Sequence, residues 1–317
     1  MLIDLPVFKV PMGWPKTVYD FKKNKFSDEK IMLGRVLFYD PILSKDNSIS
    51  CASCHSPYNA FAHTDHALSH GIGDSIGFRN APALFNLAWQ KSFMWDGAIV
   101  NLDEQAVFPI THPKEMGENL NHVIQKINNT EKYKNLIDSA YGTDSINKKQ
   151  LLQSISQFIL SLVSSNSKYD SVMHHKLFFT TQELNGYVLF KKNCSSCHTE
   201  PLFTNGSFKN NGLKPSESIN DYGRMRITQN KNDSFLFKVP SLRNLSYTYP
   251  YMHDGRFTKL SEVIQHYTSG IDLNSNISKE LKQPIVFTPN EKVDLISFLL
   301  TLNDRSFVFN PNYSFIK

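Results

Sequence analysis

The chain lacks the features that mark several common classes of protein. It has no apolar run approaching the roughly 20 residues that a helix needs to cross a membrane. Its start, Met1 to Pro6, contains neither the basic nor the apolar segment of a secretory signal. Its net charge is +5, yet acidic and basic residues are interleaved and no basic block occurs. We therefore expect no membrane span and no nucleic-acid partner.

Cysteine is scarce, but the spacing of the four cysteines is informative. They occur in two copies of the pattern Cys-x-x-Cys-His, formed by Cys51, Cys54 and His55 and by Cys194, Cys197 and His198. Two thiols three positions apart can each form a thioether with one vinyl group of a single haem. The adjacent histidine can then donate a nitrogen to the iron. The sequence predicts two covalently attached c-type haems.

Other uses of these cysteines fit the spacing less well. A zinc ribbon would hold its two cysteine pairs about 15–20 residues apart, whereas Cys54 and Cys194 are 140 positions apart. A thioredoxin-like redox pair needs one motif, not two followed by histidine. A disulfide framework is typical of short secreted chains.

The chain also repeats itself, with one offset of 158 positions and no gap. The paired segments are Pro82–Leu87 with Pro240–Leu245, Met94–Gly97 with Met252–Gly255, and Leu102 and Glu104 with Leu260 and Glu262. A helical pattern precedes each haem motif. One begins at Ser27, and the other at Thr180, with Glu183 completing a capping box.

The repeat predicts the fold. Each half reads as helix, haem motif, loop, Asp-Gly turn and helices, and ends in an apolar helix at 158–162 or 298–302. Strand signals are few. We predict an all-α fold of two cytochrome c-like haem domains related by internal duplication. Residues 1–165 form one domain and 166–317 the other, and the boundary lies in the polar stretch 164–176.

The two halves differ at a position that affects iron binding. Pro109 of the first half falls at the same offset as Tyr267 of the second. Tyrosine can bind iron from the side opposite His198, but proline offers no side-chain ligand. We infer one haem that is open to peroxide and one that is closed on both faces and passes electrons.

Two acid–base candidates follow Pro109. A carboxylate near an open haem can move a proton from one peroxide oxygen to the other. Glu115 and His112 both fit this role on chemistry alone. The simpler interpretation is that Glu115 is a solvated loop charge.

These motifs together resemble those of the bacterial dihaem cytochrome c peroxidase family, over residues 26–302. The resemblance is carried by the two CxxCH motifs, Arg79–Pro82, Trp95–Gly97, Glu104–Ala106 with Pro109 and Glu115, and Tyr249–Gly255. It implies that the haem on His55 is the peroxidatic centre, and that the haem on His198 transfers electrons.

The resemblance also implies roles for individual side chains. Glu115 would be the distal acid–base group and Gln105 its partner, while Trp95 would relay electrons between the haems. A calcium ion between the domains would be bound by oxygens of Asn80, Thr248 and Pro250, which are hard ligands that suit calcium.

One departure from the family concerns the second haem. Typical members have a distal methionine where this chain has Tyr267. Tyrosine resembles instead the branch that oxidises tryptophans in a partner protein, and an anionic oxygen ligand should lower the haem potential. Met252 remains an alternative ligand, and His266 should point to another face of the helix.

A second feature concerns the resting state of the first haem. Many peroxidases of the family have a histidine that caps this haem and swings away on reduction. His70, between Ser69 and Gly71, is the candidate. Alternatively, His70 is an exposed loop residue, or His63 or His66 plays the part.

The preferred interpretation is a peroxidase that reduces hydrogen peroxide to water. Its electrons would come from a small donor protein such as a monohaem cytochrome c or a cupredoxin. The alternatives are a tryptophan-oxidising enzyme and, less favoured, a plain electron carrier. The resemblance also implies a homodimer. Thioether attachment takes place outside the cytoplasm, so we expect a periplasmic protein whose chain as given lacks its true N-terminus or begins at a late start codon.

Overall fold

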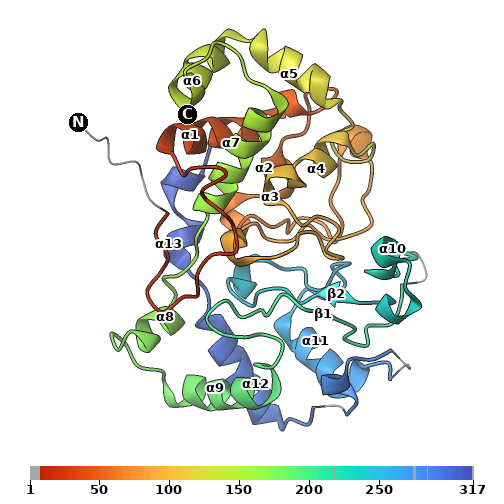
Figure 1. Ribbon diagram of the computed structural model, residues 1–317. Coiled ribbons are helices and arrows are strands. Elements are labelled where there is room, and N and C mark those ends of the chain that lie inside the picture. The colour runs from red at the N-terminus through yellow and green to blue at the C-terminus, as the bar shows by residue number, and fades with distance from the viewer. Residues whose placement is uncertain (1–7, 217–218, 274–275, 284, 316–317) are drawn as a thin grey trace.

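The computed structural model describes residues 8–216, 219–273, 276–283 and 285–315, and these are mostly helical (Figure 1). The α-helices are α1 (Asp28–Tyr39), α2 (Cys51–Cys54), α3 (Leu102–Gln105), α4 (Val107–Thr111), α5 (Leu120–Asn128), α6 (Glu131–Tyr141), α7 (Lys148–Ser161), α8 (Lys168–Met173), α9 (Thr181–Asn193), α10 (Met225–Thr228), α11 (Leu260–Gln265), α12 (Pro289–Leu300) and α13 (Arg305–Val308). Strands β1 (Phe208–Lys209) and β2 (Phe237–Lys238) pair antiparallel. None of the described helices is long and apolar enough to cross a membrane.

Short 3₁₀ turns connect these elements, and one π-helical turn follows α11. The 3₁₀ turns are Pro41–Leu43, Pro57–Asn59, Ile72–Asp74, Leu87–Trp89, Lys231–Asp233, Leu245–Tyr247, Lys279–Leu281 and Pro311–Tyr313. The π-helical turn is His266–Gly270. The prediction of a mostly helical chain with few strands is confirmed.

In the first half, α1 packs against α7. Ser27 caps α1, as the sequence predicts, and its side chain accepts a hydrogen bond from the backbone of Lys30. Gly34 allows the close approach, because a Cβ atom there would lie 1.9 Å from the carbonyl oxygen of Ser154. Phe38 and Phe158 are fully buried beside this contact.

In the second half, α9 packs against α12 in the same manner. Thr180 and Glu183 form the predicted capping box at the start of α9. A Cβ atom on Gly186 would lie 1.9 Å from the carbonyl oxygen of Asp294. Phe190 and Phe298 are fully buried here, so each half has a core beside its haem motif.

The loops after the haem motifs also have matching conformations at the offset of 158. Asn86 and Asn244 both have left-handed backbones, with φ of 58° and 61°. The N–H of Asn86 donates to the carbonyl of Leu162 (2.9 Å), and that of Asn244 donates to the carbonyl of Leu302 (3.2 Å). Each loop is therefore tied to the closing helix of its own half.

The stretch predicted to separate the halves contains a helix that the sequence did not predict. This helix, α8, is held by Asp170, which accepts two hydrogen bonds, at 2.8 and 2.7 Å, from the fully buried Arg243. Phe307 and Val308 of α13 follow the second half in sequence but belong to the core cluster of the first. The last segment therefore returns to the first half, on the left of Figure 1.

Candidate haem sites

The first CxxCH motif forms the short helix α2, which begins after Ser50. The N–H of His55 donates to the carbonyl of Cys51 (2.9 Å), so the histidine closes the turn that carries the two thiols. Cys51 and Cys54 are not joined by a disulfide. Both thiols are therefore available for thioether bonds.

The histidine of this motif has the state required of an iron ligand. His55 Nδ1 lies 2.9 Å from the carbonyl oxygen of Phe61. Because a carbonyl can only accept, Nδ1 carries the proton and the lone pair of Nε2 is free. Burial lowers the pKa of His55 to about 4, so the ring is neutral at pH 7.

The second motif repeats this arrangement. His198 Nδ1 lies 3.1 Å from the carbonyl oxygens of both Phe203 and Pro240, which again leaves Nε2 free. Burial lowers the pKa of His198 to about 4. Phe61 and Phe203, whose carbonyls face His55 and His198, both have left-handed backbones, with φ of 61° and 55°.

The donor sets fit c-type haem. Each offers two thiols on one turn and a neutral, oriented imidazole, and the residues that would hold the groups are those predicted from the sequence. In the described part of the chain, no group of three or more His, Cys, Asp or Glu side chains is arranged to bind a metal ion directly.

Glu115 lies beside the first motif, in the loop after α4. Its charge contributes, after burial, to raising the pKa of Cys54 to about 11, which places the carboxylate near α2. Burial raises the pKa of Glu115 itself to about 7. His112 Nδ1 is 3.7 Å from Glu115 Oε1, and the His112 ring stacks on Phe108. The structure thus brings both acid–base candidates to one place.

Pro109 and Gln105 lie on the elements that lead into this loop. Pro109 lies within α4, and Gln105 ends α3. The amide of Gln105 is 3.8 Å from the sulfur of Met94. Among the described residues no hydrogen bond joins Gln105 to Glu115, so their predicted pairing stays a prediction.

The three candidate histidines for the resting state lie together. The rings of His66 and His70 are 4.5 Å apart, and those of His63 and His66 are 5.7 Å apart. His70 Nδ1 is 2.6 Å from Asp74 Oδ1, and the backbone oxygen of His70 is 3.6 Å from the sulfur of Cys54. The loop therefore borders the first site, and the choice of ligand stays a prediction.

Tyr267 occupies the second position of the π-helical turn after α11. Such turns are frequent at functional sites. Burial raises the pKa of Tyr267, a hydrogen bond from Asn211 lowers it, and the nearby Cys194 and Cys197 raise it slightly. The phenol therefore lies close to the second haem motif.

The two alternatives to Tyr267 have other partners. The amide of Asn211 is 3.5 Å from the sulfur of Met252. His266 Nε2 is 3.0 Å from the backbone oxygen of Asn211, so a hydrogen bond already occupies this nitrogen. Met94, the counterpart of Met252, contacts an amide in the same way, which favours a shared structural role for both methionines.

Trp95 lies where the two halves meet. Its indole N–H donates to the carbonyl of Asn80 (2.9 Å). Its ring faces His253 edge-on, with centroids 6.5 Å apart. Arg79 forms ion pairs at 2.6 Å with Asp96 of the first half and Asp221 of the second.

The predicted calcium ligands are less well defined. The side-chain amide of Asn80 donates to the carbonyl of Ala67 (3.0 Å). The N–H of Thr248 donates to Leu245. No hydrogen bond in the described ranges joins Asn80 to Thr248 or Pro250, so the calcium site stays a prediction.

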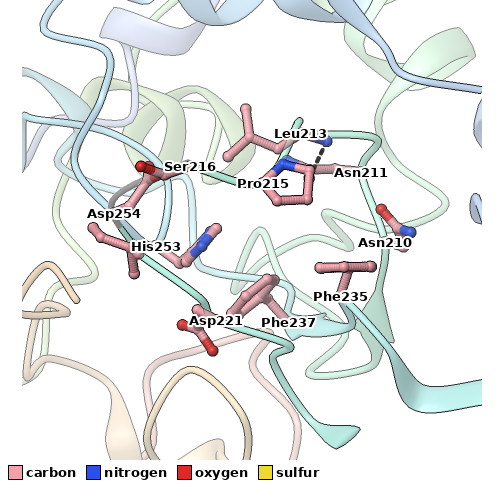
Figure 2. Close-up of a pocket in the computed structure, with 11 residues that line it drawn as sticks. Asn210, Asn211, Leu213, Pro215, Ser216, Asp221, Phe235, Phe237, His253 and Asp254 are labelled. Atoms are coloured by element: carbon pink, nitrogen blue, oxygen red, sulfur yellow. Dashed lines mark hydrogen bonds between the residues drawn. The ribbon is translucent and has the colours of Figure 1, made fainter. Parts of the chain in front are cut away.

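Sequence reasoning missed several residues of these sites. Asn211 and Asp221 lie in a loop of the second half for which the repeat gave no partner, so nothing in the sequence marked them. Lys238 could have been found, because it is the counterpart of Asn80 at the offset of 158. Together with other residues, Asn211, Asp221, Phe237 and His253 line a cavity (Figure 2).

Comparison with known proteins agrees with these sites. The model of the di-haem cytochrome c peroxidase family matches residues 28–178. The methylamine utilization protein MauG of Methylorubrum extorquens is 34% identical over 94% of this chain and 85% of its own length. Cytochrome c551 peroxidase of Nitrosomonas europaea is 36% identical over 80% of this chain and 77% of its own.

Solved structures show the same fold. A MauG-like protein associated with microbial copper homeostasis superposes with a TM-score of 0.88 at 29% identity, over 97% of this chain and 98% of that one. The diheme peroxidase BthA of Burkholderia thailandensis gives a TM-score of 0.77 at 21% identity, over 94% of this chain and 93% of that one, a likeness of fold alone.

The fold and the two donor sets define a haem-binding oxidoreductase. The chain belongs to the di-haem cytochrome c peroxidase family, as the sequence motifs predicted. It is an oxidoreductase of the cytochrome c peroxidase type, a class that acts on peroxide, and the family implies two haem c groups.

Proposed function

We propose that the protein reduces hydrogen peroxide to water at the haem held by the first motif. Two electrons from a small donor protein enter at the second haem and pass to the first. The observation that carries this proposal is the difference between the distal sides. Glu115, an acid with a pKa of about 7, borders the first motif, whereas a partly buried phenol, Tyr267, borders the second.

When bound, the first haem would supply the iron that takes up peroxide and accepts electrons. The chain supplies the proton transfer. The Glu115 carboxylate takes the proton from the near peroxide oxygen and returns it to the far one, which leaves as water. A pKa of about 7 suits this exchange, because both forms of the acid are then populated at neutral pH.

At the second motif, the phenol oxygen of Tyr267 would close the face opposite His198. Burial raises the pKa of Tyr267, and the side-chain hydrogen bond with Asn211 opposes this rise, so Asn211 is the neighbour that favours the phenolate. Trp95 would relay electrons across the contact between the halves, where its ring meets His253.

We also infer that the two halves arose by duplication, as domains 1–165 and 166–317. The matching helix pairs, the equal backbone angles at Asn86 and Asn244, and the equivalent bonds to Leu162 and Leu302 support this. The predicted periplasmic location, calcium ion, cytochrome or cupredoxin donor and homodimer remain part of the proposal. They rest on the chemistry of haem attachment and on the family resemblance.

A second function, oxidation of tryptophan in a partner protein, is favoured by one observation. Tyr267 lies at the second motif, and an anionic ligand that stabilises oxidised iron suits storage of an oxidising equivalent there. The MauG relative agrees with this alternative without deciding it.

Turnover with a reduced monohaem cytochrome c tests the proposal. The loaded protein should oxidise two molecules of cytochrome for each peroxide, since peroxide and two protons take two electrons to give two waters. The control is the same protein with Glu115→Gln. If peroxide is consumed without oxidation of the cytochrome, the peroxidase proposal is wrong and a protein substrate should be sought.

A further inference from the structure

The contact between the halves contains two equivalent hydrogen bonds. The N–H of Asn80 donates to the carbonyl of His253 (2.8 Å), and the N–H of Lys238 donates to the carbonyl of Trp95 (2.7 Å). Lys238 is the counterpart of Asn80, and His253 that of Trp95, at the offset of 158. Each half therefore holds the Asp-Gly turn of the other, and the two turns meet.

The glycines of these turns make equally close contacts. A Cβ atom on Gly97 would lie 2.3 Å from the ring of Phe208 in the second half, and one on Gly255 would lie 2.5 Å from the carbonyl oxygen of Ala67 in the first. Both glycines also have positive φ, of 73° and 67°. The positions of Trp95 and His253 are thus fixed from both sides.

The fixed turns place three rings in series. Trp95 meets His253 edge-on, at 6.5 Å between centroids and 72° between planes. His253 lies flat on Phe237, at 3.7 Å and 16° (Figure 2). Arg79, paired with Asp221 and Asp96, lies 5.7 Å above Phe237. Because burial lowers the pKa of His253 below its usual range, the stacked imidazole is neutral at pH 7.

We propose that His253, stacked on Phe237, is a positioning residue for Trp95. It holds the indole in the orientation in which electrons pass from the second half to the first. His253 itself is neither oxidised nor protonated in this step. Trp95 gives one electron to the first site and regains one from the second, so the relay ends unchanged. This inference rests on the proposed relay role of Trp95.

The experiment compares substitutions in the ring series in the protein carrying both haems. His253→Phe keeps a flat ring on Phe237, His253→Leu removes the ring, and Phe237→Leu removes the surface on which the ring lies. Phe235→Leu is the matched control, because Phe235 lines the same cavity but its ring contacts Tyr222, in a tilted arrangement. Stopped-flow absorbance would follow the oxidation of the second haem after peroxide is added. Reduction potentials of both haems and the unfolding midpoint would be measured beside it.

We expect His253→Leu and Phe237→Leu to slow electron exchange by roughly tenfold or more, since small misplacements of a reacting group have effects of this order. His253→Phe and Phe235→Leu should stay within about twofold of the wild type, and the two potentials should not change. A lowered unfolding midpoint with an unchanged exchange rate would overturn the inference, because His253 would then serve packing alone.

Trp95→Leu distinguishes the relay role of Trp95 from the positioning role of His253. If Trp95→Leu slows exchange and His253→Leu does not, the relay stands and the positioning role is wrong. If neither slows it, the relay assignment is wrong as well. If His253→Leu does not fold, Phe237→Leu and His253→Phe still decide, because equal rates in these two variants would contradict a role for the stacked ring.

Discussion

The two haem motifs are alike on the histidine side and different on the other. His55 and His198 are both partly buried, and each is held through Nδ1 by a backbone carbonyl. Glu115 lies beside the first motif, and Tyr267, near Asn211, lies beside the second. We therefore propose that the frame common to the halves attaches a haem, and that Glu115 and Tyr267, which differ between the halves, set what each haem does.

The same comparison holds where the halves touch. Trp95 and His253 occupy equivalent turns, and their carbonyls accept equivalent hydrogen bonds, from Lys238 and Asn80 respectively. A tryptophan is easily oxidised, whereas His253 stacks flat on Phe237, which is the basis of its proposed positioning role. In our proposal, equivalent positions of the two halves therefore have different roles.

The largest expected effect comes from removing one attachment at a time. Cys194→Ala with Cys197→Ala should leave one covalent haem after acid-acetone extraction, and peroxide should still bind to the reduced first haem. Cys51→Ala with Cys54→Ala should also leave one haem but abolish peroxide binding. Haem content and peroxide-induced spectra are the measurements. Equal peroxide binding in the two variants would contradict the prediction that only the first haem binds peroxide.

Glu115→Gln should give the next largest effect. The amide keeps the shape of the side chain but cannot take up the peroxide proton, so turnover should fall by about 10²–10⁴-fold, as is usual for positioned acid–base groups. Both haem spectra should be retained. His112→Gln is the matched control at the other acid–base candidate, 3.7 Å away. A larger loss in His112→Gln than in Glu115→Gln would transfer the role to the histidine.

Substitutions at Tyr267 test the closed haem. Tyr267→Met should raise the potential of the second haem on the order of 100 mV, a fraction of the roughly 0.8 V that axial ligands cover. Tyr267→Phe should leave that haem open to added ligands such as cyanide. Spectroelectrochemistry and ligand titration are the measurements. A methionine–iron band in the wild type would assign the ligand to Met252 instead.

Trp95→Phe should have a smaller effect. Phenylalanine preserves an aromatic ring beside His253 but is harder to oxidise and loses the hydrogen bond to Asn80. Peroxide should still bind, while oxidation of the second haem should slow by roughly tenfold or more, at least as much as in His253→Leu, because the relay itself is replaced. Stopped-flow traces that match the wild type, together with a lowered unfolding midpoint, would make Trp95 a core residue only.

The sequence predicted whatever depends on local pattern or on the repeat. The haem motifs, the caps at Ser27 and Thr180, and the difference between Pro109 and Tyr267 needed only spacing. It could not predict Asn211, whose backbone and side chain contact His266 and Met252 across more than 40 positions. Nor could it predict that α13 returns to the first core, because apolar residues such as Phe307 do not show which core they join.

The smallest expected effect is on the pH dependence of stability. The pKa of Glu115 is raised by burial to about 7, whereas an unfolded glutamate has a pKa of about 4.3. Between these values the folded state binds more protons at this site than the unfolded state does. The contribution of protonated Glu115 to the free energy of unfolding is therefore fully present below about pH 4, and it is lost as pH rises through 7.

Glu115→Gln should remove this dependence, because the amide does not titrate. The difference in unfolding midpoint between variant and wild type should grow from pH 5 to pH 8 in favour of the variant. The effect should be modest, since the Glu115 side chain is 38% exposed and solvent screens its charge. Glu104→Gln, at an exposed position of α3, is the control and should show no such trend. Parallel curves for wild type and Glu115→Gln would mean that the acid is solvated, as in the simpler interpretation of its loop.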